Sequence, residues 1–143
     1  MNARADFAER EERRLGRLLA AAIHAECTHA AGHGKGNVRD MEAIAAAFLN
    51  RAALETRKGT SGVSFETLCQ ERIALVERPL DRQTEDPLFV ACHRIARRAL
   101  AGVLPDPTQG ATHFHTQETF PGWAHGRTPA AAFGNHLYYR EET

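Results

Sequence analysis

Residues 15–27 read LGRLLAAAIHAEC and predict a packed helix that carries a carboxylate on its apolar face. At about 100° per residue, its apolar side chains form one stripe, made of Leu15, Leu18, Leu19, Ala22 and Ile23. Glu26 falls near the centre of this stripe, one turn beyond Ala22. A buried carboxylate is costly unless it is paired or protonated, and apolar surroundings favour the protonated form that a general acid requires. Alternatively, the helix ends here and Glu26 faces water, or Glu26 forms an interior salt bridge.

The composition is that of an ordinary globular protein. The chain has 143 residues, of which 43% are hydrophobic and 25% charged, and we expect one domain over residues 1–143, with a charged helical extension at 1–14. The 18 basic residues balance the 18 acidic residues without forming a block, so we expect no nucleic-acid partner. The sequence contains no run of about 18 apolar residues, so it predicts no membrane span. The N-terminus shows no signal-peptide pattern.

Three further helices are predicted from their start signals. The second begins at Asn37 or Asp40, either of which can cap it. A short third helix, FETLCQE, follows Ser64. The fourth has Asp86 as N-cap, continues with PLFVACHRIARRALA and ends at Gly102. Residues 28–40 and most of 71–85 are predicted loops. Three cysteines without close spacing indicate reduced, mostly buried thiols.

The C-terminal part predicts two short strands. In ATHFHT, residues 111–116, alternation places His113 and His115 on one face. In NHLYYR, residues 135–140, His136 and Tyr138 share one side. The strands can pair as an antiparallel ribbon beside the helices, so the predicted fold class is α+β and mainly helical.

The pair His113 and His115 also raises the question of a metal site. Two histidines on one strand face can ligate zinc, with a third ligand from His136, His125 or an acid. Polar strand faces carry such pairs without metal just as often. We therefore expect no metal and no cofactor, and keep a zinc-dependent hydrolase as an alternative.

Other side chains are of the types that bind sugar polymers, which use aromatic faces and hydrogen-bonding groups. The candidates for substrate binding are Gln70, His113, His115, Trp123 and Tyr138. The histidines and Tyr138 can equally form a plain polar strand face, and Trp123 can pack in the core. Glycosidic cleavage needs a proton donor, and Glu26 is the candidate. No second carboxylate is evident near it, which favours a route in which the substrate supplies its own nucleophile.

Several segments together resemble the SleB-type cell wall hydrolases, which include the spore cortex-lytic enzymes. They are LLAAAIHAEC (18–27), AIAAAFLNRA (43–52), ALAGVLPDPTQGATHFH (99–115), FPGWA (120–124) and FGNHLYYR (133–140). The resemblance implies a lysozyme-like α+β fold with a peptidoglycan cleft and cleavage between N-acetylmuramic acid and N-acetylglucosamine, by lytic transglycosylation in characterised members. It also implies that Glu26 is the catalytic glutamate.

Two features depart from the family pattern. The family continues E-A-R-G-E, whereas residues 26–30 read ECTHA, and Gln70 is followed by Glu71 and Arg72 instead of a Q-F-S-type segment. The predicted function is a peptidoglycan lytic transglycosylase. A muramidase and a non-catalytic peptidoglycan-binding module are alternatives. We expect action on the cell wall or in the periplasm, by an export route that the sequence does not reveal, and the sequence predicts no oligomeric state.

Overall fold

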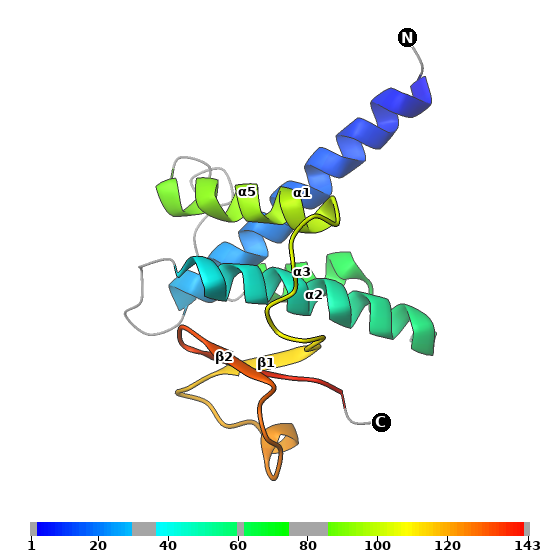
Figure 1. Ribbon diagram of the computed structural model, residues 1–143. Coiled ribbons are helices and arrows are strands. Elements are labelled where there is room, and N and C mark those ends of the chain that lie inside the picture. Colours follow the sequence, from blue (N-terminus) through cyan, green and yellow to red (C-terminus); the bar gives the residue numbers. More distant parts are fainter. Residues whose placement is uncertain (1–2, 30–36, 60–61, 75–85, 142–143) are drawn as a thin grey trace.

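The chain folds into helices that cover one face of a small sheet (Figure 1). The structure, a computed structural model, describes residues 3–29, 37–59, 62–74 and 86–141. The helices are α1 (Ala3–His29), α2 (Val38–Lys58), α3 (Phe65–Ile73) and α5 (Pro87–Leu100). The strands are β1 (His113–Thr116), β2 (Ala131–Phe133) and β3 (His136–Tyr139), and a short 3₁₀ helix, η1 (Gly122–Ala124), lies between β1 and β2. The predicted mainly helical α+β class is confirmed.

The helices begin at the predicted caps. The side chain of Asn37 accepts a hydrogen bond from the backbone N–H of Asp40 and so starts α2. Ser64 and Thr67 form a reciprocal capping box at α3. Asp86 caps α5, in which Pro87 occupies the first turn. Each cap satisfies a backbone N–H that has no partner inside its helix, so these polar residues fix where the helices start.

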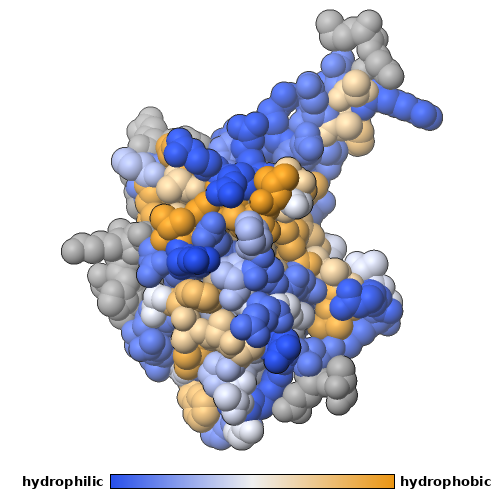
Figure 2. Space-filling model, in the orientation of Figure 1, coloured by the Kyte–Doolittle hydropathy of each residue, from blue (hydrophilic) through white to orange (hydrophobic). Residues whose placement is uncertain are grey.

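The second half of α1 is the centre of the core. Leu19, Ala22 and Ile23 are fully buried, and this helix packs against α2, α3 and α5. Alanines dominate the buried face of α2, which lets the helices approach closely. The first half of α1 projects from the molecule (Figure 1) and is mostly hydrophilic (Figure 2). Even Phe7, on this half, is 62% exposed.

The sheet has three antiparallel strands in the order β1-β3-β2. Phe114 lies opposite Tyr138, and Phe133 opposite His136. The sequence predicted two strands and missed β2, because the segment AAF that follows Pro129 carries neither alternation nor β-branched residues. Opposed residues share a face, so Phe114, His136 and Tyr138 point to the helices, whereas His113 and Tyr139 point away.

Some expectations concern residues that lie outside this description. The predicted loop at 28–40 is described only at its ends, where α1 runs to His29 and α2 begins at Val38. In the predicted loop at 71–85, residues 71–73 are the last turn of α3, and residues 75–85 are not described. The three cysteines are free and buried, as predicted. None of the helices described here has the length and apolar character to cross a membrane.

Candidate active site

Glu26 lies near the C-terminal end of α1, where α3 and β3 meet that helix. Its side chain is almost completely enclosed, with 5% of the residue exposed. The carboxylate is nevertheless not in apolar surroundings. Arg72 of α3 places Nη1 2.9 Å from Oε1, and His136 of β3 places Nε2 3.3 Å from Oε2. The sequence alternative of an interior salt bridge is the arrangement found.

His136 joins Glu26 to a second carboxylate. Its Nδ1–H donates to Oδ2 of Asp40 at 2.8 Å, and its Nε2–H donates to Glu26. Asp40 belongs to the first turn of α2 and is 5% exposed, whereas His136 is 1% exposed. Both ring nitrogens therefore donate to carboxylates inside the protein, which is the bonding pattern of an imidazolium.

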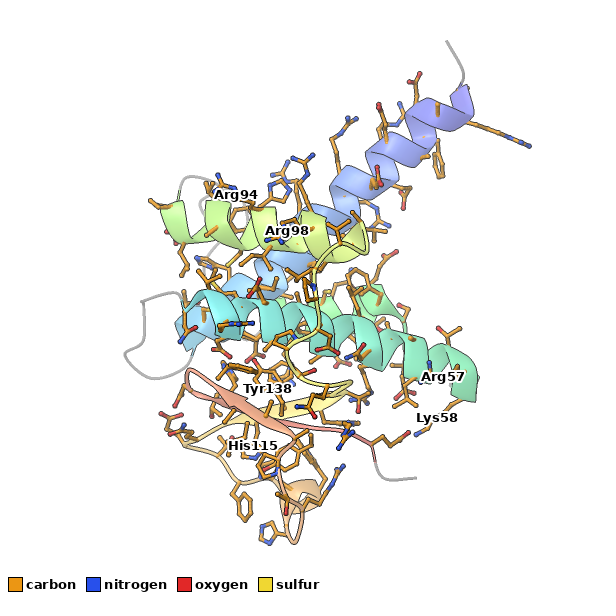
Figure 3. All side chains as sticks on the ribbon, in the orientation of Figure 1. Arg57, Lys58, Arg94, Arg98, His115 and Tyr138 are labelled. Carbon is orange, nitrogen blue, oxygen red and sulfur yellow. The ribbon has the colours of Figure 1, made fainter. Side chains whose placement is uncertain are left out.

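Tyr138 completes this buried group on the side away from Glu26. Its hydroxyl donates to Oδ1 of Asp40 at 2.6 Å. Figure 3 shows Tyr138 between α2 and the sheet. Burial, reinforced by the charge of Asp40, raises the pKa of Tyr138. The hydroxyl therefore remains a donor at physiological pH, and it orients Asp40 rather than facing a ligand.

The four ionic side chains Glu26, Asp40, Arg72 and His136 form what we call the ion cluster. Burial alone would lower the pKa of His136, but the hydrogen bonds to Asp40 and Glu26 outweigh burial and raise it to about 9. The cluster thus pairs two carboxyl groups with two basic side chains. Such balance is needed because an unpaired charge is expensive to bury.

Arg72 connects the ion cluster to the surface. Its side chain is 39% exposed, and the guanidinium lies over the ring of Phe114, 5.0 Å from the ring centroid. It also lines a hollow of ≈ 160 Å³, which we call the Trp123 hollow. The walls come from α2, α3, the start of the sheet and the loop after β1: Ala47, Phe48, Arg51, Leu68, Glu71, Arg72, Thr112, His113, Phe114 and Trp123.

The Trp123 hollow offers an aromatic face and charged groups to a ligand. Trp123 is 39% exposed and packs edge-on against Tyr139, with the ring centroids 5.1 Å apart. Burial, aided by the charges of Arg51 and Arg127, lowers the pKa of His113, so its ring is neutral at neutral pH. Typical ligand pockets exceed roughly 300 Å³, so this hollow can hold only a small part of a polymer.

The structure places the predicted binding residues at four separate locations. His113 and Trp123 line the Trp123 hollow, and Tyr138 belongs to the buried network of Asp40. Gln70 is exposed and does not line the hollow. His115 is 7% exposed on the face of the sheet away from α2 (Figure 3). All of these remain predictions as binding residues, but only His113 and Trp123 are placed to contact a ligand in the hollow.

His115 is an unsuitable metal ligand. Its Nδ1 donates to the carbonyl of Thr116 at 2.7 Å, and its Nε2 is hydrogen-bonded to the hydroxyl of Tyr139 at 2.9 Å. With Nδ1–H donating to this carbonyl, the lone pair on Nε2 accepts the hydrogen bond from the Tyr139 hydroxyl and is already engaged. His136, a suggested third ligand, points to the opposite face of the sheet. Across the described ranges, no three His, Cys, Asp or Glu side chains gather in a way that suits a metal ion.

A larger hollow of ≈ 450 Å³ lies along the outer face of α5. Its lining consists of Val90, His93, Arg94, Arg97, Arg98, Ala101 and Val103, and Figure 3 labels Arg94 and Arg98 on this helix. The lining contains no carboxylate, so this hollow has no candidate for the acid that glycosidic cleavage requires. The chemistry therefore favours the smaller Trp123 hollow.

Sequence reasoning missed Asp40 and Arg72 as members of the site. Asp40 was considered only as a helix cap, and nothing in its neighbourhood indicates that α2 starts beside Glu26. The position of Arg72 depends on how α3 docks against α1, which the sequence does not show. The sequence did contain an indication that His136 belongs to the site, because the alternation in NHLYYR places it on the same side of the strand as Tyr138.

The family of the chain follows from a comparison with protein-family models. The model for the cell wall hydrolase family matches residues 35–139. The chain belongs to the cell wall hydrolase family. The match covers α2, α3, α5 and the sheet, and thus includes Asp40, Arg72 and His136 of the ion cluster. Glu26 precedes the matched residues, so its assignment depends on the geometry of the site and on the resemblance of the first helix.

Membership of this family indicates that the protein is an enzyme that acts on peptidoglycan at the cell wall. Comparisons of this cell wall hydrolase with curated proteins and with solved structures gave no match.

Proposed function

We propose that the protein cleaves the glycan strands of peptidoglycan between N-acetylmuramic acid and N-acetylglucosamine, as a lytic transglycosylase with Glu26 as catalytic acid and base. The observation that carries this proposal is the enclosed Glu26, which Arg72 connects to an aromatic hollow at the surface. Family membership indicates peptidoglycan as the substrate, and the site contains a residue able to exchange a proton with it.

The reaction requires one carboxyl group to act twice. Protonated Glu26 donates its proton to the glycosidic oxygen, and the bond from this oxygen to C1 of muramic acid breaks. C1 gains oxocarbenium character, and the C6 hydroxyl of the same sugar attacks it. The carboxylate of Glu26 takes the proton from this hydroxyl, which restores the acid and leaves a 1,6-anhydro end. No water is consumed, and no second carboxylate has to activate one.

Arg72 has to move for the first step. In the structure Arg72 occupies Oε1 of Glu26, and His136, the second cation, occupies Oε2. Arg72 is the more exposed of the two cations and already extends into the Trp123 hollow. A glycan that enters this hollow displaces Arg72 from Oε1, and the carboxyl group can then take up a proton.

The Trp123 hollow suits part of a sugar polymer. The partly exposed ring of Trp123 can lie against the apolar face of a pyranose, while His113 and Arg51 hydrogen-bond its hydroxyl or acidic substituents. Hydrophobic contact and hydrogen bonds together would align the glycosidic oxygen with Oε1 of Glu26. Catalysis depends strongly on such alignment.

The test compares the wild type with Glu26→Gln on purified sacculi. We expect the wild type to release muropeptides with 1,6-anhydro ends and the variant to lose at least about 10²-fold of the rate, the usual contribution of a general acid or base. Mass spectrometry of the products distinguishes the chemistry, because hydrolysis by water leaves reducing ends.

Two outcomes would contradict the proposal. A Glu26→Gln variant that is fully active would remove Glu26 from the reaction. A folded wild type that binds sacculi without releasing any fragment would identify a binding module. Trp123→Ala is the companion variant. Loss of the indole ring should weaken substrate binding and so raise KM, with a smaller effect on kcat.

A further inference from the structure

The ion cluster contains a pair, His136 and Asp40, that the reaction described above does not use. Its members come from opposite ends of the fold, β3 and the first turn of α2, yet they meet at 2.8 Å in the interior. Both are almost completely buried. A hydrophobic pair of similar volume would stabilise the fold at least as well, so stability alone does not explain why a charged pair is placed beside Glu26.

The backbone around Asp40 is shaped to hold this pair. Asn37 fixes the backbone N–H of Asp40, and Tyr138 fixes Oδ1. On the remaining side lies Gly134, in the turn between β2 and β3. A Cβ at Gly134 would stand 2.9 Å from Oδ2 of Asp40, closer than two such atoms normally approach. Asn37 thus fixes the backbone of Asp40, while Tyr138 and Gly134 confine its carboxylate and leave Oδ2 for His136.

The two oxygens of Glu26 have different environments. Oε2 faces His136 in the closed interior, whereas Oε1 faces Arg72, which extends to the surface. A substrate in the Trp123 hollow can exchange with Arg72 but cannot reach His136, which is 1% exposed. Oε2 of Glu26 therefore keeps His136 as its partner, whereas Oε1 can exchange Arg72 for a group of the substrate.

We infer that the pair His136–Asp40 is a positioning device for Glu26. It holds a permanent cation on Oε2 and presents Oε1 as the oxygen that exchanges the proton with the substrate. His136 and Asp40 are positioning residues in this account, since neither reaches the hollow. The inference rests on the proposed function and adds to it which oxygen reacts and what fixes its direction.

The arrangement has a chemical advantage for a residue that must act as acid and then as base. After proton donation, the negative charge on Glu26 is stabilised by an imidazolium that is already in place, so no reorganisation is required at that moment. The anchored oxygen also keeps the carboxyl plane from rotating, which preserves the geometry for recapture of the proton.

Asp40→Asn is the variant that tests the device, because it removes the charge that maintains His136 as a cation and conserves the side-chain shape. We expect kcat on sacculi to fall about 10²-fold, the typical effect of a misplaced catalytic group, with KM nearly unchanged. We also expect the titration of His136, followed by NMR of labelled imidazole rings and assigned with His136→Gln, to move to lower pH.

The matched control is Asp86→Asn. Asp86 also pairs with a buried histidine, at 2.6 Å from Nε2 of His24, and His24 lies only two residues from Glu26 but faces α5. Asparagine is also a good helix cap, so α5 should still start in place. We expect this control to retain the kcat of the wild type and the wild-type titration of His136.

The outcomes separate this inference from the proposed function. If the wild type is active and Asp40→Asn keeps its kcat although His136 titrates at lower pH, the positioning role is wrong. If Asp40→Asn does not fold, the wild type decides: a neutral His136 ring at pH 7 overturns the inference, and a charged ring supports it. A wild type that releases no fragment from sacculi refutes the proposed function, and the titration of His136 still tests the permanent cation.

Discussion

At the scale of single residues, the main finding is that the interior holds a balanced set of charges. Glu26 and Asp40 share His136, and Arg72 closes the set from the surface. None of the four could be buried alone at an acceptable cost. Each substitution in this set therefore acts on its partners as well as on itself, and effects of paired substitutions should not add.

The raised pKa of His136 makes stability depend on pH. The folded value is about 9 and the usual value is 6.5, so protonated His136 stabilises the fold by about 3 kcal/mol at about 1.4 kcal/mol per unit. This contribution is complete below pH 6.5 and is lost as the pH rises through 9. We expect the free energy of unfolding, measured with urea, to decline between pH 6.5 and 8.5.

Asp40→Asn provides the control for this decline. Without the Asp40 carboxylate, the pKa of His136 returns toward its usual value and most of the pH dependence should vanish. Burial also raises the pKa of Cys69 to about 12, and the unfolded thiol ionises at about pH 8.5, so the cysteines lower stability mainly above the pH range of this measurement. Parallel curves for the two proteins would show that His136 is not the source.

At the scale of elements, the turn between β2 and β3 connects the sheet to α2. Gly134 has φ +53°, a left-handed conformation that favours glycine. Its missing Cβ also makes room for Asp40. The hairpin can therefore close against the first turn of α2 only with glycine at this position.

We predict that Gly134→Ala destabilises the protein by about 2–4 kcal/mol, the sum of backbone strain and displacement of a buried carboxylate. Gly126→Ala is the control, because Gly126 has φ +77° but nothing lies within 4 Å of its added Cβ. It should show the strain alone, about 1–2 kcal/mol. Equal losses in urea unfolding would mean that the contact with Asp40 has no energetic weight.

The elements themselves were largely predictable, whereas the contacts between them were not. Helix starts at Asn37, Ser64 and Asp86 followed from local capping chemistry, and the strand at His113 followed from alternation. The three-residue β2, with the sequence AAF, gave no such signal. Within the site, the enclosure of Glu26 was predicted from its place on the stripe. Its partners were not, because they come from α2, α3 and β3 and meet it only through tertiary packing.

At the scale of the whole molecule, the long α1 divides into a packed half and a projecting half (Figure 1). The apolar stripe begins at Leu15, and the side chains before it are mostly exposed. Arg14 ties the projecting half to the body, because its guanidinium contacts Glu66 of α3 at 2.8 Å. We therefore propose, as the sequence suggested, that residues 1–14 are an extension to the catalytic domain.

Deletion of residues 2–10 should leave the domain intact. Because residues 3–10 are mostly exposed, we expect the free energy of unfolding to change by no more than about 0.5 kcal/mol and the rate on sacculi to be unchanged. Deletion of residues 2–19 is the contrasting variant and should abolish folding, since it removes the buried Leu19. A loss of several kcal/mol in the shorter deletion would place the extension within the cooperative unit.

The position of His136 in the last strand has a consequence for biosynthesis. A ribosome makes α1 and α2 well before β3, so Glu26 and Asp40 emerge while their shared counter-ion is still missing. Mutual repulsion then opposes closure of the helices around them, and chains that end before β3 do not assemble the ion cluster. The site of this cell wall hydrolase can therefore assemble only after β3 has left the ribosome.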